Sequence, residues 1–223
     1  MKIERFSCGP LTLGKIKVSD ELSFEEALRP LLTEEEIQAS LKFKHTLRRR
    51  EFLSGRAILH FLNPELPSVL IAQGGQPLWP DSMTGSITHK SGYVCASVVS
   101  MLKYKAVGID LEEVSHFPKR VADIISTEEE VHSVQNYFHE EGFALAFIFS
   151  IKETLFKTCY PLCRIWFGFH DAKFLSCNLK TNTFKIQILK DLADHFKKGD
   201  IFEGHFQDLF LDQRRFVLTL LHL

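Results

Sequence analysis

The sequence predicts an α+β protein whose strands pair mainly in antiparallel fashion. Helix-like segments gather before residue 63 and again between residues 126 and 158. Strand-like segments gather between residues 86 and 111 and again after residue 183. Strands that follow one another in blocks, instead of alternating regularly with helices, favour α+β over a βαβ array.

The first block contains two expected helices. Thr33 can cap a helix whose third residue is Glu36, which is the pattern of a capping box. A second helix is expected over 45–62, and Asn63-Pro64 should end it. Its apolar positions, mixed with charged ones, are Leu47, Phe52, Ala57, Ile58, Leu59 and Leu62.

A strand block is expected next. A turn is predicted at 74–77, and Pro80 and Gly85 should keep the residues after it irregular. Short runs of β-branched and small apolar residues then predict strands at 86–89, 93–100 and 106–111.

The remaining segments complete the pattern. Ser126-Thr127 followed by acidic residues predicts another helix start, and 142–158 predicts a long apolar helix that ends near Pro161. Alternating or apolar runs predict the last strands at 183–189, 201–206 and 216–221.

The composition excludes several classes of protein. The chain has 223 residues, 45% hydrophobic and 25% charged, and its 20 phenylalanines should mostly lie in a core. A net charge of -1 gives no bulk attraction to nucleic acid or to an anionic membrane. No apolar run reaches the roughly 20 residues of a membrane span. Five cysteines without an apolar leader favour a soluble cytoplasmic protein with reduced thiols.

Three carboxylates are the strongest functional signal. Asp110 and Glu112 lie two apart at the end of an apolar strand, so both should leave the same face. Glu153 and Lys157 lie four apart on the long apolar helix and face the same way. Hard oxygen ligands without His or Cys suit Mg²⁺, and Lys152 and Lys157 could hold phosphate groups beside it.

Two further segments indicate an anion site. Six basic residues lie between residues 42 and 56, and Arg49 and Arg56 are two helical turns apart. Thr88-His89 places a hydroxyl beside an imidazole on a strand, which could bind a phosphate or begin a nucleophilic site. An ordinary basic surface and an ordinary strand end are the alternatives.

Five segments in order resemble the 4′-phosphopantetheinyl transferases, in particular the surfactin-type branch and its enterobactin-synthetase-like group. They are R-R-R-E-F-L-S-G-R (48–56), G-Q-P-L-W-P (75–80), G-S-I-T-H-K (85–90), V-G-I-D-L-E (107–112) and F-S-I-K-E-T-L-F-K (149–157). The resemblance implies two similar α/β-sandwich halves with pseudo-twofold symmetry, residues 1–104 and 105–223, with the active site in the cleft between them. It also implies a monomer.

The resemblance further implies an activity and a set of roles. The family transfers the 4′-phosphopantetheine arm of coenzyme A to a serine of an apo acyl, aryl or peptidyl carrier protein and releases adenosine 3′,5′-bisphosphate. Mg²⁺ (Mn²⁺ as an alternative) would be bound by Asp110, Glu112 and Glu153, and Glu153 would be the base. The coenzyme A phosphates would be bound by Arg49, Arg56, Thr88, His89, Lys152 and Lys157. Gln76 stands where many members have lysine, and Phe149 where many have tryptophan.

Other interpretations stay open at this point. A non-catalytic coenzyme A or nucleotide-binding module would keep the same pocket without turnover. A nucleic-acid-binding protein would use the basic segment 42–56. The segment after Glu112, with Phe117 and Val121, is a candidate docking surface for the carrier. The carrier protein itself and its pathway are not readable from the residues.

Overall fold

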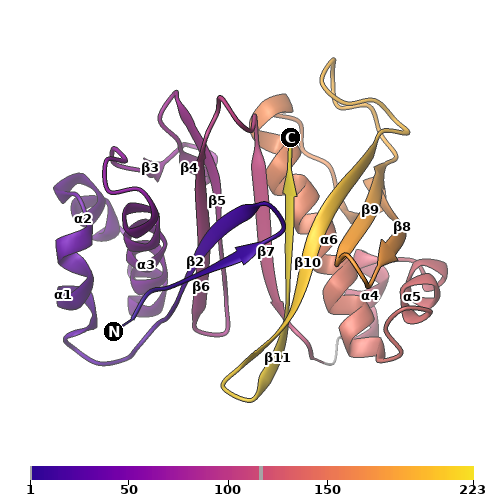
Figure 1. The fold of residues 1–223 in the computed structure, drawn as a ribbon, viewed down its shortest axis with the longest axis horizontal. Coiled ribbons are helices and arrows are strands. Elements are labelled where there is room, and N and C mark those ends of the chain that lie inside the picture. Colours follow the sequence, from indigo (N-terminus) through magenta and orange to yellow (C-terminus); the bar gives the residue numbers. More distant parts are fainter. Residues whose placement is uncertain (1, 116–117) are drawn as a thin grey trace. The chain divides into compact units, whose positions relative to one another are not determined.

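The protein divides into two compact units, one ending at Lys105 and the other beginning at Ala106. The computed structural model describes residues 2–115 and 118–223. Each unit combines an antiparallel sheet with a long helix packed on it (Figure 1). The α+β class predicted from the sequence is therefore confirmed. The predicted division, after residue 104, falls one residue before the observed boundary.

The first unit is a four-stranded sheet in the order β1-β2-β6-β5, and every neighbouring pair is antiparallel. Helix α3 packs on this sheet through Ile58 and Leu59, which are fully buried. The elements are β1 (Glu4–Cys8), β2 (Leu11–Lys17), α1 (Phe24–Leu28), η1 (Arg29–Leu31), α2 (Glu34–Ser40), α3 (Thr46–Leu62), β3 (Leu70–Ile71), β4 (Pro77–Leu78), β5 (Met83–Lys90) and β6 (Tyr93–Ser100).

The second unit is a five-stranded antiparallel sheet in the order β7-β11-β10-β9-β8. Helix α6 packs over β7 and β11 (Figure 1). The elements are β7 (Val107–Glu113), α4 (Lys119–Ile125), α5 (Glu128–Gln135), α6 (Glu141–Cys163), η2 (Phe169–Asp171), β8 (Ala172–Asn178), β9 (Thr183–Ile188), β10 (Ile201–Leu211) and β11 (Arg214–His222).

Phenylalanines fill the core of the second unit, as the composition predicts. The ring of Phe147 on α6 lies 5.2–6.0 Å from the rings of Phe174, Phe184 and Phe206 on the sheet, each in an edge-to-face arrangement. Such pairs contribute about 0.5–1.5 kcal/mol each beyond the burial of their area. This cluster fixes α6, which carries three of the predicted site residues, against the sheet.

Most predicted elements are present, with corrections at their ends. Helix α6 continues through Pro161 to Cys163, so the proline lies in its last turn and does not end it at once. Gly85 lies inside β5 and not in an irregular segment. Leu47 belongs to α3 but is half exposed, so it is not part of the core face. The elements not predicted include strands β1, β2, β3, β4 and β8 and helices α1 and α4.

The helices give no sign of a membrane-spanning segment. Among residues 2–115 and 118–223, no helix is both long and apolar enough to cross a bilayer. This agrees with the prediction made from the apolar runs of the sequence. Phe117, one of the two predicted docking residues, lies outside the described residues, whereas Val121 is exposed on α4.

The predicted capping box at Thr33 is present, and its glutamate, Glu36, also binds residues outside the helix. Glu36 is fully buried and accepts hydrogen bonds from the Thr33 and Val69 backbone amides. His60 on α3 places Nε2 2.9 Å and 3.1 Å from its two carboxylate oxygens. Burial raises the pKa of Glu36, but these hydrogen bonds more than offset burial and hold the pKa below its usual value. One carboxylate thus joins α2, α3 and the chain before β3.

We expect Glu36→Gln to lower the free energy of unfolding of this unit by about 2 kcal/mol at pH 7, since a buried network loses its charged acceptor. A lowered pKa contributes stability above the unfolded value of 4.5 that is lost as the pH falls. The difference between the two proteins should therefore shrink below pH 4.5. Urea unfolding at several pH values measures this, and Glu34→Gln, exposed on the same helix, should change stability by less than about 0.5 kcal/mol.

Candidate active site

The second unit holds its site residues on two elements that approach unusually closely, β7 and α6. Gly108 on β7 faces the Thr154 carbonyl and the Thr158 hydroxyl of α6, and a Cβ at this position would clash with both. The absence of a side chain is thus what lets the helix backbone lie against the strand. The group that approaches Gly108 is therefore the backbone of α6.

Hydroxyl groups align the two elements along this contact. Ser150 donates to the Asp110 carbonyl at 3.2 Å, and its Oγ lies 2.8 Å from the Thr219 hydroxyl of β11. Thr154 lies 2.6 Å from the same hydroxyl. The three hydroxyls of α6, on Ser150, Thr154 and Thr158, recur every four residues, so they line one face of the helix. This four-residue spacing of hydroxyl side chains in an apolar helix could have indicated a polar contact with the strand, but it was not predicted from the sequence.

Asp110 and Glu112 lie on β7 as predicted, but they are buried. Only 4% of Asp110 and 6% of Glu112 is exposed, so these carboxylates do not lie on a solvated strand end. Lys157 on α6 reaches across with Nζ 2.6 Å from Asp110 Oδ1 and 3.2 Å from the Ile109 carbonyl. The ammonium therefore balances a buried carboxylate whose isolated charge would be costly. The packing of α6 on β7 brings Lys157 to Asp110.

Glu153 lies one turn before Lys157 and is partly buried. Burial raises the pKa of its carboxyl group, the negative charge of Asp110 raises it further, and Lys157 lowers it in part. A charge effect of this kind requires Asp110 to be near. Glu153, Asp110 and Lys157 therefore form one group of interacting charges.

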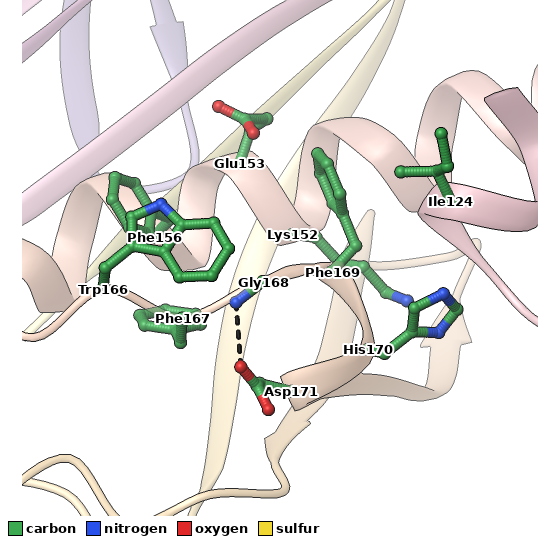
Figure 2. Close-up of a pocket in the computed structure, with 10 residues that line it drawn as sticks. All are labelled: Ile124, Lys152, Glu153, Phe156, Trp166, Phe167, Gly168, Phe169, His170 and Asp171. Carbon is green, nitrogen blue, oxygen red and sulfur yellow. Dashed lines mark hydrogen bonds between the residues drawn. The ribbon is translucent and has the colours of Figure 1, made fainter.

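An apolar pocket of about 430 Å³ adjoins Glu153. It lies between α6, the end of α4 and the chain that follows α6, where the Gly168 amide donates to Asp171 Oδ2 at 2.9 Å. Figure 2 shows Phe156, Trp166 and Phe167 grouped together, with the Glu153 carboxylate pointing away from them in this view. The lining residues are Ile124, Lys152, Glu153, Phe156, Trp166, Phe167, Gly168, Phe169, His170 and Asp171.

Lys152 leaves α6 in a different direction from Glu153 (Figure 2). Its Nζ lies 2.6 Å from Glu130 Oε2 and 2.9 Å from the Ile125 carbonyl, and both charged side chains are buried. Glu130 also accepts the Phe174 amide at 2.7 Å. The structure thus engages Lys152 in joining α6 to α4, α5 and β8, and its predicted contact with phosphate would require this ion pair to open.

In the first unit, His89 on β5 lies against α3. Its Nδ1 is 3.2 Å from Glu51 Oε1, and its Nε2 meets the Arg48 guanidinium. Arg48 and Glu51 also contact each other at 3.4 Å. Arg48 and Glu51 were not predicted as site residues, although both lie inside the basic segment 42–56 from which an anion site was predicted.

The other predicted residues of this unit lie elsewhere. Arg49 binds Glu25 on α1 with an Nη2–Oε1 distance of 2.8 Å. Arg56 is buried, donates to the Val69 carbonyl at 2.9 Å, and has a pKa lowered by burial to about 10. Thr88 is buried and precedes His89 on β5, so the two side chains point to opposite faces of the sheet. Of the predicted set in this unit, His89 contacts Arg48 of α3 directly.

The carboxylates of the second unit suit a hard cation in their chemistry. Asp110, Glu112 and Glu153 offer only oxygen ligands, and the negative charge of Asp110, which raises the pKa of Glu153, favours a positive charge near them. In the described part of the chain, however, no three His, Cys, Asp or Glu side chains already converge as a metal-binding group. The donor set therefore fits Mg²⁺ in its chemistry, while Asp110 is paired with Lys157.

Both units match one enzyme family. Residues 106–218 match the 4′-phosphopantetheinyl transferase superfamily, and residues 36–100 match the 4′-phosphopantetheinyl transferase N-terminal domain. The chain belongs to the 4′-phosphopantetheinyl transferase superfamily. It is therefore a transferase that attaches phosphopantetheine to carrier proteins, in a family that generally uses coenzyme A and a divalent metal.

Curated relatives agree with this family. The chain is 30% identical over 164 residues to the 4′-phosphopantetheinyl transferase Npt of Nocardia iowensis, covering 70% of this chain and 71% of the relative. It is 35% identical over 129 residues to the 4′-phosphopantetheinyl transferase PptT of Mycobacterium tuberculosis, covering 56% and 57%. It is 32% identical over 139 residues to enterobactin synthase component D of Salmonella typhi, covering 59% and 56%.

The contact at Gly108 gives a direct test of this geometry. We expect Gly108→Ala to lower the free energy of unfolding by about 1–3 kcal/mol and to reduce transfer activity, because the methyl group pushes β7 away from α6 and separates Asp110 from Lys157. Thermal unfolding and a transfer assay measure the two effects. Gly168→Ala is the matched control for the unfolding measurement, since its Cβ would meet only the end of the Trp166 ring, at 3.3 Å. An equal loss of stability in both variants would contradict the role of the β7–α6 contact.

Proposed function

We propose that the second unit performs the transfer chemistry, with coenzyme A pyrophosphate at the Asp110–Glu153–Lys157 group and the pantetheine arm in the adjoining pocket. The observation that carries this proposal is the meeting of two different environments at Glu153. A group of interacting charges suits a pyrophosphate, whereas an apolar pocket suits a long uncharged arm. Glu153 stands where these two parts of the ligand would join.

In this proposal Asp110, Glu112 and Glu153 hold Mg²⁺, or Mn²⁺ in its place. When bound, the cation supplies charge neutralisation and alignment for the pyrophosphate oxygens. Lys157 balances Asp110 in the protein alone. When a cation shares those carboxylates, the Lys157 ammonium is available to pair with the departing phosphate.

Glu153 is proposed as the base. Its carboxylate takes the proton from the carrier serine hydroxyl, and the serine oxygen bonds to the phosphorus that carries the pantetheine arm. The bond from that phosphorus to the bridging oxygen breaks, and adenosine 3′,5′-bisphosphate leaves with the electron pair. A raised pKa suits this task, because a carboxylate with a higher pKa accepts a proton more readily.

The first unit is proposed to bind other phosphate groups of coenzyme A. His89 with Arg48 is the best-supported pair, because the two side chains meet at the surface of α3 and β5. Arg49, Arg56, Thr88 and Lys152 stay predictions from the resemblance. To contact phosphate, Arg49, Arg56 and Lys152 would have to release the hydrogen-bond partners described above or bind phosphate beside them. Thr88 would have to act from the sheet face opposite to His89.

The narrower assignments rest on the resemblance and on the relatives. We assign the chain to the surfactin-type branch and its enterobactin-synthetase-like group, which fits the similarity to enterobactin synthase component D. We propose a cytoplasmic monomer, and the five cysteines, all free, are compatible with a reducing compartment. The acceptor is proposed to be an apo acyl, aryl or peptidyl carrier protein.

Intact-mass measurement tests the transfer reaction. The protein is incubated with coenzyme A, Mg²⁺ and separate apo fatty-acid, aryl and peptide-synthetase carriers. At least one carrier should gain the mass of the phosphopantetheine arm. Glu153→Gln should slow this gain by about 10²–10⁴-fold, since it removes the base, while Glu129→Gln, exposed on α5, should not. Tight binding of coenzyme A without mass gain on any carrier would instead support a non-catalytic binding module.

The raised pKa of Glu153 also predicts an effect on stability. A group whose folded pKa is raised destabilises the protein at pH values above its unfolded pKa, so Glu153→Gln should raise the melting temperature of the metal-free protein at pH 7. This gain should disappear as the pH falls below 4.5. Added Mg²⁺ should stabilise the original protein more than the variant. An equal response to Mg²⁺ would remove Glu153 from the metal site.

A further inference from the structure

The contact between α3 and β5 in the first unit contains three polar side chains that form a chain of interactions. Glu51 Oε1 lies 3.2 Å from His89 Nδ1, Arg48 meets His89 Nε2, and Arg48 Nη1 lies 3.4 Å from Glu51 Oε2. The carboxylate is the most enclosed member, with 10% of its side chain exposed, whereas 53% of Arg48 is exposed. The group thus has an inner acid, a central imidazole and an outer guanidinium.

Hydrogen-bond chemistry fixes the protonation of the imidazole in this arrangement. A guanidinium only donates, so His89 Nε2 must accept from Arg48 and carries no proton. Nδ1 then carries the single ring proton and donates it to Glu51. His89 is therefore neutral in the protein alone, and Glu51 determines which nitrogen faces outward.

The described neighbours of the ring come from β5, β6 and α3. Lys90 follows His89 on β5, and the register of the sheet sets the apolar Val94 of β6 opposite His89. From α3, Arg48 and Glu51 face the ring, with opposite charges. With a neutral imidazole this group has a net charge of zero, and one added proton makes it +1.

We propose that Glu51 is a positioning residue for phosphate recognition: it holds His89 with Nε2 outward and stabilises the imidazolium that forms when a phosphate group of coenzyme A replaces Nε2 as the partner of Arg48. The inference rests on the proposed function, which supplies the phosphate. The proton comes from solvent and is added to Nε2, which then donates to a phosphate oxygen. Nδ1 keeps its proton and its bond to Glu51, so no other bond changes.

The arrangement has a measurable consequence, which is proton uptake on binding. A neutral imidazole cannot donate from Nε2, so phosphate binding near pH 7.5 must take up about one proton at His89. The affinity for coenzyme A should therefore fall as the pH rises, by up to about tenfold per pH unit. Without the Glu51 carboxylate the imidazolium is less stable, so both the affinity and the uptake at that pH should decrease.

Titration calorimetry of the full chain with coenzyme A tests this, in two buffers of different ionisation enthalpy. His89→Gln removes the imidazole, so the difference between the original protein and this variant gives the share of protons taken up at His89. Glu51→Gln should reduce that share by half or more and weaken binding about tenfold, and Glu51→Asp should restore part of both. Glu26→Gln, exposed on α1, is the matched control. Circular dichroism with thermal unfolding shows that the variants are folded.

Parallel titration with 3′-dephospho-coenzyme A identifies the phosphate group. If no protons are taken up at His89 with this ligand, His89 binds the 3′-phosphate. If the uptake at His89 is unchanged, His89 binds the pyrophosphate. Both results support the role of Glu51. The proposal is overturned if Glu51→Gln takes up the same number of protons as the original protein and binds coenzyme A equally well. An intact-mass transfer assay on the same preparations tests the proposed transferase function separately from the role of Glu51. The original protein can transfer the phosphopantetheine arm even if Glu51→Gln changes neither proton uptake nor affinity.

Discussion

The close contact of β7 with α6 is the constraint on which the candidate active site depends. It exists because residue 108 has no side chain, so that the backbone of the helix at Thr154 can lie against the strand. At this separation Lys157 reaches Asp110, and the hydroxyl of Ser150 reaches the Asp110 carbonyl. A wider spacing would leave buried carboxylates without a cation, which a folded protein rarely tolerates.

Two lysines of α6 have different partners because of how this helix packs. Lys152 and Lys157 are five residues apart, so they leave α6 in different directions. Lys152 binds Glu130 within the unit and connects four elements, whereas Lys157 binds Asp110 beside Glu153. Residue type and nearness in the sequence made both equal candidates for phosphate binding. Their partners, which come from distant parts of the chain, make Lys157 the stronger one.

In the first unit, too, the sequence could not distinguish between neighbouring arginines. The basic segment on α3 was correctly recognised as unusual, but the sequence could not tell which guanidinium meets His89. Helical geometry places Arg48, Glu51 and Gly55 toward β5, where Gly55 lies against Ile87. Arg49 and Arg56 turn toward α1 and toward the chain before β3, respectively. The packing of α3 on β5 therefore decided the composition of this group.

By itself, the sequence determined the α+β class, the main helices and strands, the family resemblance, and the carboxylates of β7 and α6. These follow from local periodicity, capping and motif order, which need no knowledge of distant contacts. Only the tertiary structure decided that Asp110 and Glu112 are buried, that Lys157 balances Asp110, and that Arg48 and Glu51 enclose His89. The physical reason is that burial and ion pairing depend on which elements pack together, and three-dimensional packing joins residues as far apart as Arg48 and His89.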